Sequence, residues 1–381
     1  MARFAEALAG LGHRIVLLTE TLSPDDPPPT IDFESHDWAR PLVIACPPLG
    51  HALTRRARLG ELPGGLRQAT VLGGYLFQGG MFADWGAGAA PVLPELARQF
   101  RPDIVWATFG NTEAWNIAQR LAGLAGCPWI ADLKDNWSAF LPSGLADLVS
   151  RRYRDAALMT VFSLSHCDEA DRWFPQTKTV VYSGFDKVAA NQDVAPTAGA
   201  PFRMTLTGSV YDPQVLEALV DGLYGWLTAR GRGEVVFTYA GHDGAVVSAV
   251  TERLDGLCRR DIHAFMPLEK LVVLQRASNV NLYIRNPRCL FHHKVLELFA
   301  AGRPVLSFPG ESREVVDLGR ELSAGLFSCE TGEAVAEALD IIADNPPPPP
   351  ISERLAEYSW AGQARNLAEV FERVVAAGRQ R

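Results

Sequence analysis

The sequence contains no apolar run that approaches the roughly 18 residues of a transmembrane helix and no excess of basic residues. Its 36 lysines and arginines are outnumbered by 44 aspartates and glutamates, which gives a formal charge of −8. This acidic balance argues against a dedicated nucleic-acid-binding protein. The first residues lack a signal-peptide pattern, because Glu6 and the turn at residues 10–14 interrupt any apolar segment. We expect a cytoplasmic protein without a nucleic-acid partner.

The sequence also lacks the short motifs of several enzyme classes. Its six cysteines include no C-x-x-C pair, so neither a zinc framework nor a disulfide scaffold is expected. There is no G-x-x-x-x-G-K-[ST], no G-x-S-x-G and no G-x-G-x-x-G after a strand, which disfavours NTPases, nucleophile-elbow hydrolases and nicotinamide dehydrogenases. No D-x-D pair follows a predicted strand, and the adjacent His292 and His293 would diverge on a helix. We expect no metal site and no bound cofactor.

The 381 residues do contain a regular alternation of short β-rich runs with amphipathic helical stretches, which is typical of parallel α/β sheets. Strands are predicted in the first half at residues 15–19, 42–46, 103–107, 129–131, 157–162 and 179–182. The second half repeats the pattern at residues 202–207, 235–239, 262–265, 280–284 and 304–307. One amphipathic helix is predicted to close the chain between residues 355 and 374.

This pattern predicts an α/β protein with two tandem Rossmann-like, doubly wound parallel-sheet domains. We place the amino-terminal domain at residues 1–187, a polar linker at 188–201 and the carboxyl-terminal domain at 202–345. Residues 346–381 are predicted to form a proline-rich connector and a helix that packs back toward the amino-terminal domain.

The start of the chain predicts a defect in the first sheet. A doubly wound domain normally begins with a central strand, followed by a turn and a helix. Here the apolar face of Phe4, Leu8 and Leu11 indicates that the chain begins at the helix. We expect the strands at 15–19 and 103–107 to flank a gap or to be pulled together across it. We also expect the natural protein to carry roughly 15–30 more residues at its amino terminus, one strand plus one loop.

The most informative segment begins at Arg285, where a predicted strand ends. A loop with Arg288 follows, and a helix is predicted to begin near His292. Cations in a first helical turn oppose the helix dipole, and their presence there favours an anion at the helix terminus, held by Lys294. Glu297 lies three residues later, on roughly the same face. From spacing alone, a solvated rim with an intrahelical ion pair is an equally good interpretation.

This segment resembles the K-x-x-E-x-x-A-x-G-[RK]-P-V signature of glycosyltransferases with the two-domain GT-B fold, most closely the family 4-like group that uses nucleotide-sugars. Segments similar to that group's other motifs follow one another in the same order; they are residues 8–16, 127–137, 180–186, 207–209, 239–241, 265–269 and 359–360. The resemblance covers nearly the whole chain and implies a cleft between two Rossmann-like domains.

The resemblance implies that Glu297 binds the nucleotide ribose and that Lys294 binds the diphosphate. The full set of nucleotide-sugar-binding residues that it implies is Gly208, Ser209, Gly241, Met266, Arg285, Arg288, His293, Lys294 and Glu297. Two features depart from the family. Cys289 stands where a second glutamate is common, and the basic residues usual after the glycine loop are missing. Arg285, Arg288 and Lys294 are then expected to replace the missing charge.

Two aspartates mark the acceptor side of the predicted site. Asp132 and Asp135 stand at the end of a predicted strand, at the edge where open α/β sheets bind ligands. Either carboxylate could deprotonate an acceptor hydroxyl, and Asp135 is the stronger candidate. The alternative is structural: one aspartate would cap the next turn and the other would pair with Lys134 or Arg151.

Residues 51–80 mix four arginines with leucines and aromatic residues. A surface of this kind can rest on an anionic membrane that carries a lipid-linked acceptor, whereas a solvated helix face with its back in the core is the more ordinary interpretation.

The sequence therefore predicts a metal-independent glycosyltransferase that moves a sugar from a nucleotide-diphosphate donor to a saccharide or lipid-linked hydroxyl acceptor. By family analogy it would serve bacterial polysaccharide or glycolipid assembly, in the cytoplasm or at the inner face of the membrane. The alternatives are a GT-B-type nucleotide-sugar epimerase and a catalytically silent sugar-nucleotide-binding protein.

Overall fold

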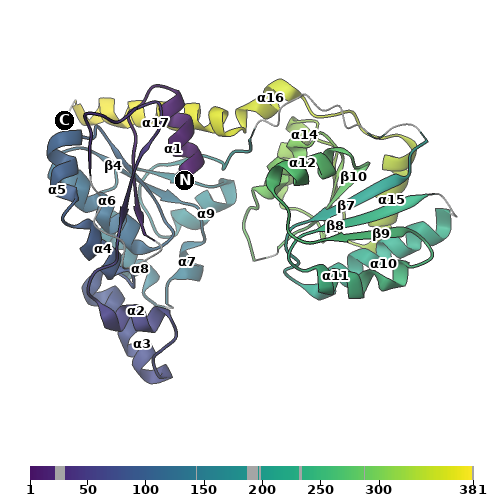
Figure 1. Cartoon of the computed structure of the whole chain (residues 1–381), viewed down its shortest axis with the longest axis horizontal. Helices are drawn as coiled ribbons and strands as arrows, with labels where there is room; N and C mark the ends of the chain where they lie inside the picture. Colours follow the sequence, from purple (N-terminus) through teal and green to yellow (C-terminus); the bar gives the residue numbers. More distant parts are fainter. Residues whose placement is uncertain are drawn as a thin grey trace. The chain divides into compact units, whose positions relative to one another are not determined.

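The computed structural model describes residues 1–21, 31–142, 144–186, 196, 199–230, 234–286 and 288–379. It divides into two compact units (Figure 1). Unit 1 comprises residues 1–183 and 360–381, and unit 2 comprises residues 184–359. Most of the linker predicted at residues 188–201 lies outside the described residues.

Unit 1 alternates strands with helices, as the apolar periodicity predicts. Its strands are β1 (Val16–Glu20), β2 (Leu42–Cys46), β3 (Val105–Thr108), β4 (Trp129–Leu133), β5 (Leu158–Val161) and β6 (Lys178–Val180). Its α-helices are α1 (Ala2–Gly10), α2 (Ala52–Arg58), α3 (Gly64–Gly73), α4 (Ala83–Ala89), α5 (Leu93–Glu95), α6 (Thr112–Ala125), α7 (Trp137–Phe140), α8 (Ala146–Ser150), α9 (Leu164–Asp171) and α17 (Trp360–Arg379). Short π and 3-10 turns complete it at η1 (Gly74–Gln78), η2 (Leu96–Phe100) and η3 (Arg151–Tyr153).

The strands of unit 1 form two separate parallel sheets, β1-β2 and β3-β4-β5-β6. Among the described strands, β1 pairs only with β2 and β3 pairs only with β4. A cavity of about 560 Å³ lies between them, lined by Val16 of β1 and Trp106 of β3 together with Leu8 of α1. The predicted gap between these two strands is confirmed, because residues 2–10 are helical and supply no central strand.

Helix α17 covers the amino-terminal helix of the same unit. Phe4 of α1 makes edge-to-face contacts with Trp106 and Trp360, at centroid distances of 5.5 and 5.1 Å. Gln363 accepts a hydrogen bond from the Tyr182 amide at 2.8 Å. The segment at 346–359 belongs to unit 2, so only residues from 360 onward join unit 1. The single helix predicted at 355–374 is in fact two, α16 (Ser352–Glu357) and α17.

Unit 2 contains one parallel sheet of order β12-β11-β10-β7-β8-β9. Its strands are β7 (Phe202–Thr207), β8 (Val235–Ala240), β9 (Arg259–His263), β10 (Val280–Ile284), β11 (Val305–Phe308) and β12 (Leu326–Ser328). Its helices are α10 (Pro213–Arg230), α11 (Gly244–Thr251), η4 (Glu252–Leu254), α12 (Leu268–Arg276), α13 (Lys294–Ala300), α14 (Arg313–Glu321), α15 (Gly332–Asp344) and α16. Strand β9 begins three residues earlier than predicted, and the edge strand β12 was not predicted.

The sheet order of unit 2 determines where a ligand would bind. The chain leaves β7 on one side through β8 and returns to its other side at β10, so β7 and β10 flank the point at which the strand order reverses. Open α/β sheets bind ligands beyond the carboxyl ends of the strands at such a point. Both strands are buried along most of their length. No helix among the described residues is long and apolar enough to cross a membrane.

Candidate functional site

The loop after β7 meets the start of α13 at this switch point. Gly208 has φ +94°, a left-handed conformation that side chains rarely adopt. A Cβ atom on Gly208 would collide with the Nζ atom of Lys294. The lysine ammonium therefore lies directly against the glycine backbone, although 86 positions separate the two residues. Two residues of the predicted nucleotide site are brought together here.

Gly241, a third predicted residue, closes the same loop from the end of β8. A side chain on it would collide with the Tyr239 hydroxyl. That hydroxyl donates to the Gly208 carbonyl at 2.7 Å and accepts from the Asp243 amide at 3.0 Å. Asp243 in turn accepts from the Val210 amide at 2.8 Å. Tyr239 and Asp243 hold the two loops in place. Sequence analysis missed both roles, although Tyr239 belongs to the quoted Tyr-Ala-Gly segment.

Lys294 is a cation without a counter-ion in the described part of the chain. The structure records no hydrogen bond or ion pair within 4 Å for its ammonium group, and Glu297 affects it only through space. Burial lowers the pKa of Lys294 to about 8, and the Glu297 carboxylate partly offsets this. A desolvated ammonium group is costly unless an anion pairs with it. The geometry of the glycine loop and Lys294 suits a phosphate group.

The two histidines precede α13 and do not belong to its first turn, since the helix begins at Lys294 and has seven residues. This corrects the predicted helix start at His292. Burial, together with His293 and Lys294, lowers the pKa of His292 to about 4, so His292 is neutral at pH 7. Its Nδ1 atom and the Tyr283 hydroxyl are buried without a hydrogen-bond partner in the described residues. Buried polar atoms normally have a hydrogen-bond partner, so these two atoms are suited to bind a ligand or an ordered water molecule.

Two further residues of the predicted site, His293 and Arg285, each lie beside a glutamate. His293 Nε2 is 3.6 Å from a Glu297 carboxylate oxygen. The Arg285 guanidinium is 4.0 Å from the buried Glu311 carboxylate, whose pKa is raised by burial. Ser209 and Arg288 are exposed and Met266 is half-buried, and no side-chain hydrogen bond or ion pair in the described residues joins any of them to Lys294.

In unit 1 the two candidate aspartates have different surroundings. Asp132, the fourth residue of β4, is completely buried. Its oxygens accept hydrogen bonds from the Thr160 hydroxyl at 2.6 Å and the Thr108 hydroxyl at 2.7 Å. Lys134 Nζ lies 3.5 Å away. A carboxylate held by three groups on neighbouring strands and loops is a structural anchor, which favours the structural alternative for Asp132.

Asp135 is half-buried and has no hydrogen bond or ion pair in the described residues. Burial raises its pKa, and the negative charge of Asp132 raises it further. A carboxylate that is free to accept and has a raised pKa suits a general base. The residues that follow Asp135 are held in place, because Glu169 accepts hydrogen bonds from the Trp137 and Ser138 amides.

The sequence analysis did not predict a role for a buried histidine of unit 1, His166. His166 lies in α9, its Nδ1 is 2.8 Å from the Ser163 hydroxyl, and burial lowers its pKa to about 4, with help from the Lys134 charge. Lys134 itself donates to the Val181 carbonyl at 2.7 Å, and burial lowers its pKa. The residues that the structure describes contain no group of three or more His, Cys, Asp or Glu side chains arranged to hold a metal ion.

No protein-family model matches the sequence, and no curated protein sequence matches it. Solved structures do match. A UDP-forming α,α-trehalose-phosphate synthase from Burkholderia vietnamiensis aligns with 97% of this chain and 100% of its own, at 13% identity and a TM-score of 0.54. The corresponding synthase from Burkholderia xenovorans covers 96% of this chain and 97% of its own, at 11% identity and a TM-score of 0.51.

A third structure is described as trehalose-6-phosphate from Escherichia coli bound with UDP-2-fluoro glucose. It aligns over 98% of this chain and 92% of its own, at 13% identity and a TM-score of 0.51. At these identities the likeness concerns the fold. The neighbours are two-domain GT-B structures, and this chain has the GT-B fold.

Proposed function

We propose that the protein is a glycosyltransferase that uses a nucleoside-diphosphate sugar and transfers the sugar to a hydroxyl acceptor without an essential metal. The observation that carries the proposal is the ammonium group of Lys294, which is desolvated, lacks a counter-ion among the described residues and lies against Gly208. The E. coli neighbour holds a UDP-sugar analogue and the two Burkholderia neighbours are named as UDP-forming, so UDP is the first nucleotide to test.

The chemistry follows from these groups. The bond between the anomeric carbon and the diphosphate oxygen breaks, and its electron pair leaves with the diphosphate. Lys294 and Arg285 stabilise the developing negative charge, as preorganised cations do in a site of low dielectric constant. The acceptor oxygen forms the new bond to the anomeric carbon, and its proton passes to Asp135. Bacterial polysaccharide or glycolipid assembly is the process that we propose for this transfer.

Removing the Lys294 side chain should weaken nucleotide binding. We expect Lys294→Ala to reduce the affinity for UDP by about 1.5–3 kcal/mol, the usual contribution of a hydrogen bond to a charged group. Isothermal titration calorimetry of the full chain would measure it. Lys270→Ala is the matched control, because Lys270 is an exposed lysine of the same unit in α12. Equal UDP affinities in all three proteins would contradict the diphosphate site.

The lowered pKa of Lys294 predicts a pH dependence of this binding. In the free protein the ammonium is charged below about pH 8 and loses its proton above it. UDP affinity should therefore be flat from pH 7 to about 8 and should then fall by up to about tenfold per pH unit. The affinity of Lys294→Ala should not show this fall. A wild-type affinity that rises between pH 8 and 9.5 would contradict the assignment.

One assay distinguishes the transferase from the two alternatives. The protein would be incubated with a panel of nucleotide-sugars and a mixture of saccharide and lipid-linked acceptors, and free nucleotide and sugar identity would be followed. A transferase releases nucleoside diphosphate only when an acceptor is present. An epimerase changes the sugar of the nucleotide-sugar without any acceptor. A silent binding protein binds the nucleotide-sugar and changes nothing.

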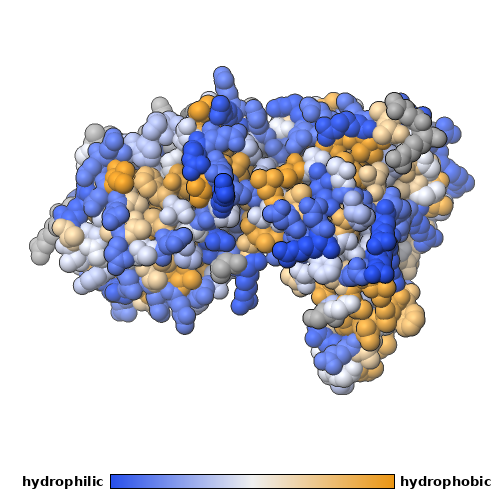
Figure 2. Space-filling view, turned by 180° about the vertical axis from the view of Figure 1, so that it is seen from behind, coloured by the Kyte–Doolittle hydropathy of each residue, from blue (hydrophilic) through white to orange (hydrophobic). Residues whose placement is uncertain are grey.

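We also propose that α2 and α3 rest on an anionic membrane. Figure 2 shows apolar side chains gathered on the projecting lobe of unit 1 that contains these helices. Large apolar side chains around them are exposed, at Leu49, Leu53, Leu59, Leu66, Leu72 and Phe77. Arg55 and Arg56 lie in the same segment. Exposed leucines beside arginines are suited to the interface of an anionic bilayer.

Vesicle binding would test this proposal. The double variant Leu59→Asp, Leu66→Asp should bind vesicles of phosphatidylglycerol and phosphatidylcholine at least about tenfold more weakly than the wild type, since each leucine buried in the interface contributes about 1.5–3 kcal/mol. Leu124→Asp is the control, because Leu124 in α6 is as exposed as Leu66. Equal sedimentation of all three proteins with the vesicles would show that the lobe does not bind membranes.

A further inference from the structure

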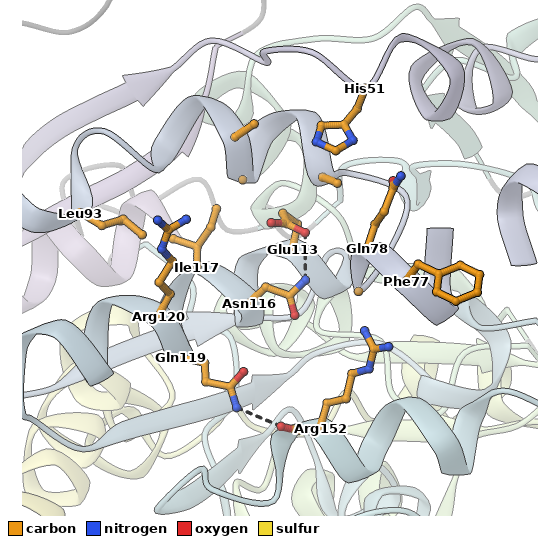
Figure 3. A pocket seen from close by; sticks show the side chains of 14 residues that line it. His51, Phe77, Gln78, Leu93, Glu113, Asn116, Ile117, Gln119, Arg120 and Arg152 are labelled. Atoms are coloured by element: carbon orange, nitrogen blue, oxygen red, sulfur yellow. Dashed lines mark hydrogen bonds between the residues drawn. The ribbon is translucent and has the colours of Figure 1, made fainter. Parts of the chain in front are cut away.

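A second cavity, unrelated to the nucleotide site, lies within unit 1. It has a volume of about 760 Å³, within the range of about 300–1,000 Å³ typical of small-molecule sites, and it is lined from α4, α6, η1 and η3. The polar side chains that reach it include Glu113, Arg120 and Arg152 (Figure 3). In this view the Glu113 carboxyl lies between the two guanidinium groups.

Two glycines let the backbone approach the polar side chains of this cavity closely. A Cβ atom on Gly86 of α4 would collide with a Glu113 carboxylate oxygen. A Cβ atom on Gly79, whose φ is +84°, would lie 2.6 Å from the Asn116 amide nitrogen and 3.2 Å from Arg152 Nη1. A side chain at either position would displace Glu113 or Asn116 from its present place.

The polar groups are held in place by a chain of hydrogen bonds. The Tyr153 hydroxyl donates to Asn116 Oδ1 at 2.9 Å, and Asn116 Nδ2 donates to Glu113 Oε2 at 2.9 Å. Arg152 Nη2 donates to the Leu76 carbonyl at 2.7 Å. Gln119 fixes the turn that carries Arg152 by donating to the Arg152 carbonyl at 2.9 Å. The groups are thus oriented before any ligand arrives, which reduces the entropic cost of binding.

Two of these polar groups can form further hydrogen bonds. Glu113 is only 7% exposed, yet its Oε1 has no recorded partner in the described residues. Burial raises the pKa of Glu113 to about 7. A neighbouring buried carboxylate shows the contrast: Asp84 is bound at both oxygens by Arg58, at 2.6 and 2.8 Å. Arg120 likewise has no hydrogen bond or ion pair with any residue that the structure describes.

We propose that this cavity binds an anionic polyol, a hexose phosphate or a headgroup of the same chemistry. The guanidinium group of Arg120 suits a phosphate group, and Arg152, on the other side of the Glu113 carboxyl in Figure 3, adds positive charge to the cavity. The Glu113 carboxyl and the amides of Asn116 and Gln78 suit hydroxyl groups. The binding site depends on these contacts in unit 1 alone. Identifying its ligand as the acceptor of sugar transfer rests on the function proposed above.

Calorimetric titration of the full chain with glucose 6-phosphate, glucose and inorganic phosphate tests the proposal. We expect saturable binding of glucose 6-phosphate, with a Kd below about 1 mM, and at least about tenfold weaker binding of glucose. Arg120→Met and Glu113→Gln should each weaken the binding of glucose 6-phosphate about tenfold or more. Arg154→Met is the control, since Arg154 is an exposed arginine that does not line the cavity. Arg120 is exposed and has no partner in the described part of the chain, so its replacement should leave folding intact.

Two further measurements identify the source of the ligand and separate this site from the nucleotide site. Binding of phosphatidylinositol vesicles that free glucose 6-phosphate displaces would indicate a membrane headgroup. Saturating UDP should leave the affinity for glucose 6-phosphate unchanged, and a failure of UDP to bind would count against the proposed transferase only. Absence of saturable binding of glucose 6-phosphate, equal affinity for glucose, or wild-type affinity in both cavity variants would overturn the proposal.

Discussion

Replacing Asp135 by asparagine should lower the rate of sugar transfer by about 10²–10⁴, the usual contribution of a general base. The change keeps the size of the side chain and removes only its ability to accept a proton. Asp135 belongs to unit 1, whereas the proposed diphosphate-binding residues belong to unit 2, so the affinity for UDP should stay within a few-fold. Transfer kinetics with a saturating nucleotide-sugar, combined with UDP titration, would measure both quantities.

Asp132 provides the matching comparison, because it lies three residues earlier and is fully hydrogen-bonded. Asp132→Asn should lower the free energy of unfolding, since the amide group cannot accept from Thr108, Thr160 and Lys134 as a carboxylate does. Asp135 has no such partners among the described residues, and its replacement should leave the unfolding transition almost unchanged. Transfer at the wild-type rate by Asp135→Asn would return Asp135 to a structural role.

Filling the gap in unit 1 should raise the free energy of unfolding by about 3–5 kcal/mol. The facing edges of β1 and β3 are unpaired among the described strands, and apolar side chains line the cavity between them. Met1 contacts Thr108, the last residue of β3. A strand added parallel to β3 would also end near Thr108, so a short loop could join its carboxyl end to Met1. About five new ladder hydrogen bonds at about 0.5–1.5 kcal/mol each account for this gain.

The experiment compares three proteins by urea denaturation: the chain itself, the chain with five Val and Ile residues and a short turn added before Met1, and the chain with a Gly/Ser extension of equal length. Only the apolar extension should raise the midpoint. It should also slow amide exchange in β1 and β3, because their free edges become hydrogen-bonded. Equal midpoints, together with unchanged exchange in both strands, would show that the cavity does not accept a strand.

Much of the fold follows from patterns that are local in the chain. Apolar runs bounded by Gly or Pro identified β1, β2, β3 and β4 within one or two residues, because strands of parallel sheets are rich in apolar residues. The alternation of strand and helix predicted parallel sheets, since a parallel pair requires a crossover connection. Edge elements were harder: β12 has three residues with little burial, too short for a periodic signal.

The candidate site was predictable only in part. Gly208 and Lys294 were both identified from the sequence, and their contact follows from the pairing of β7 with β10. The separation of Asp132 from Asp135 into an anchor and a free carboxylate was not predictable in this way. It depends on hydroxyl groups of Thr108 and Thr160, which reach Asp132 from β3 and β5 because of the register of those strands.

By itself, the sequence determined that the chain forms two parallel α/β units, that residues 2–10 are a helix and not a strand, and that cations follow β10. Each of these rests on side-chain periodicity or on the order of elements along the chain. Only the tertiary structure decided that Lys294 is half-buried without a counter-ion in the described residues and that Glu113, Arg120 and Arg152 line a cavity. Such arrangements bring together residues that lie far apart in the chain, and their charge states depend on burial, which only packing determines.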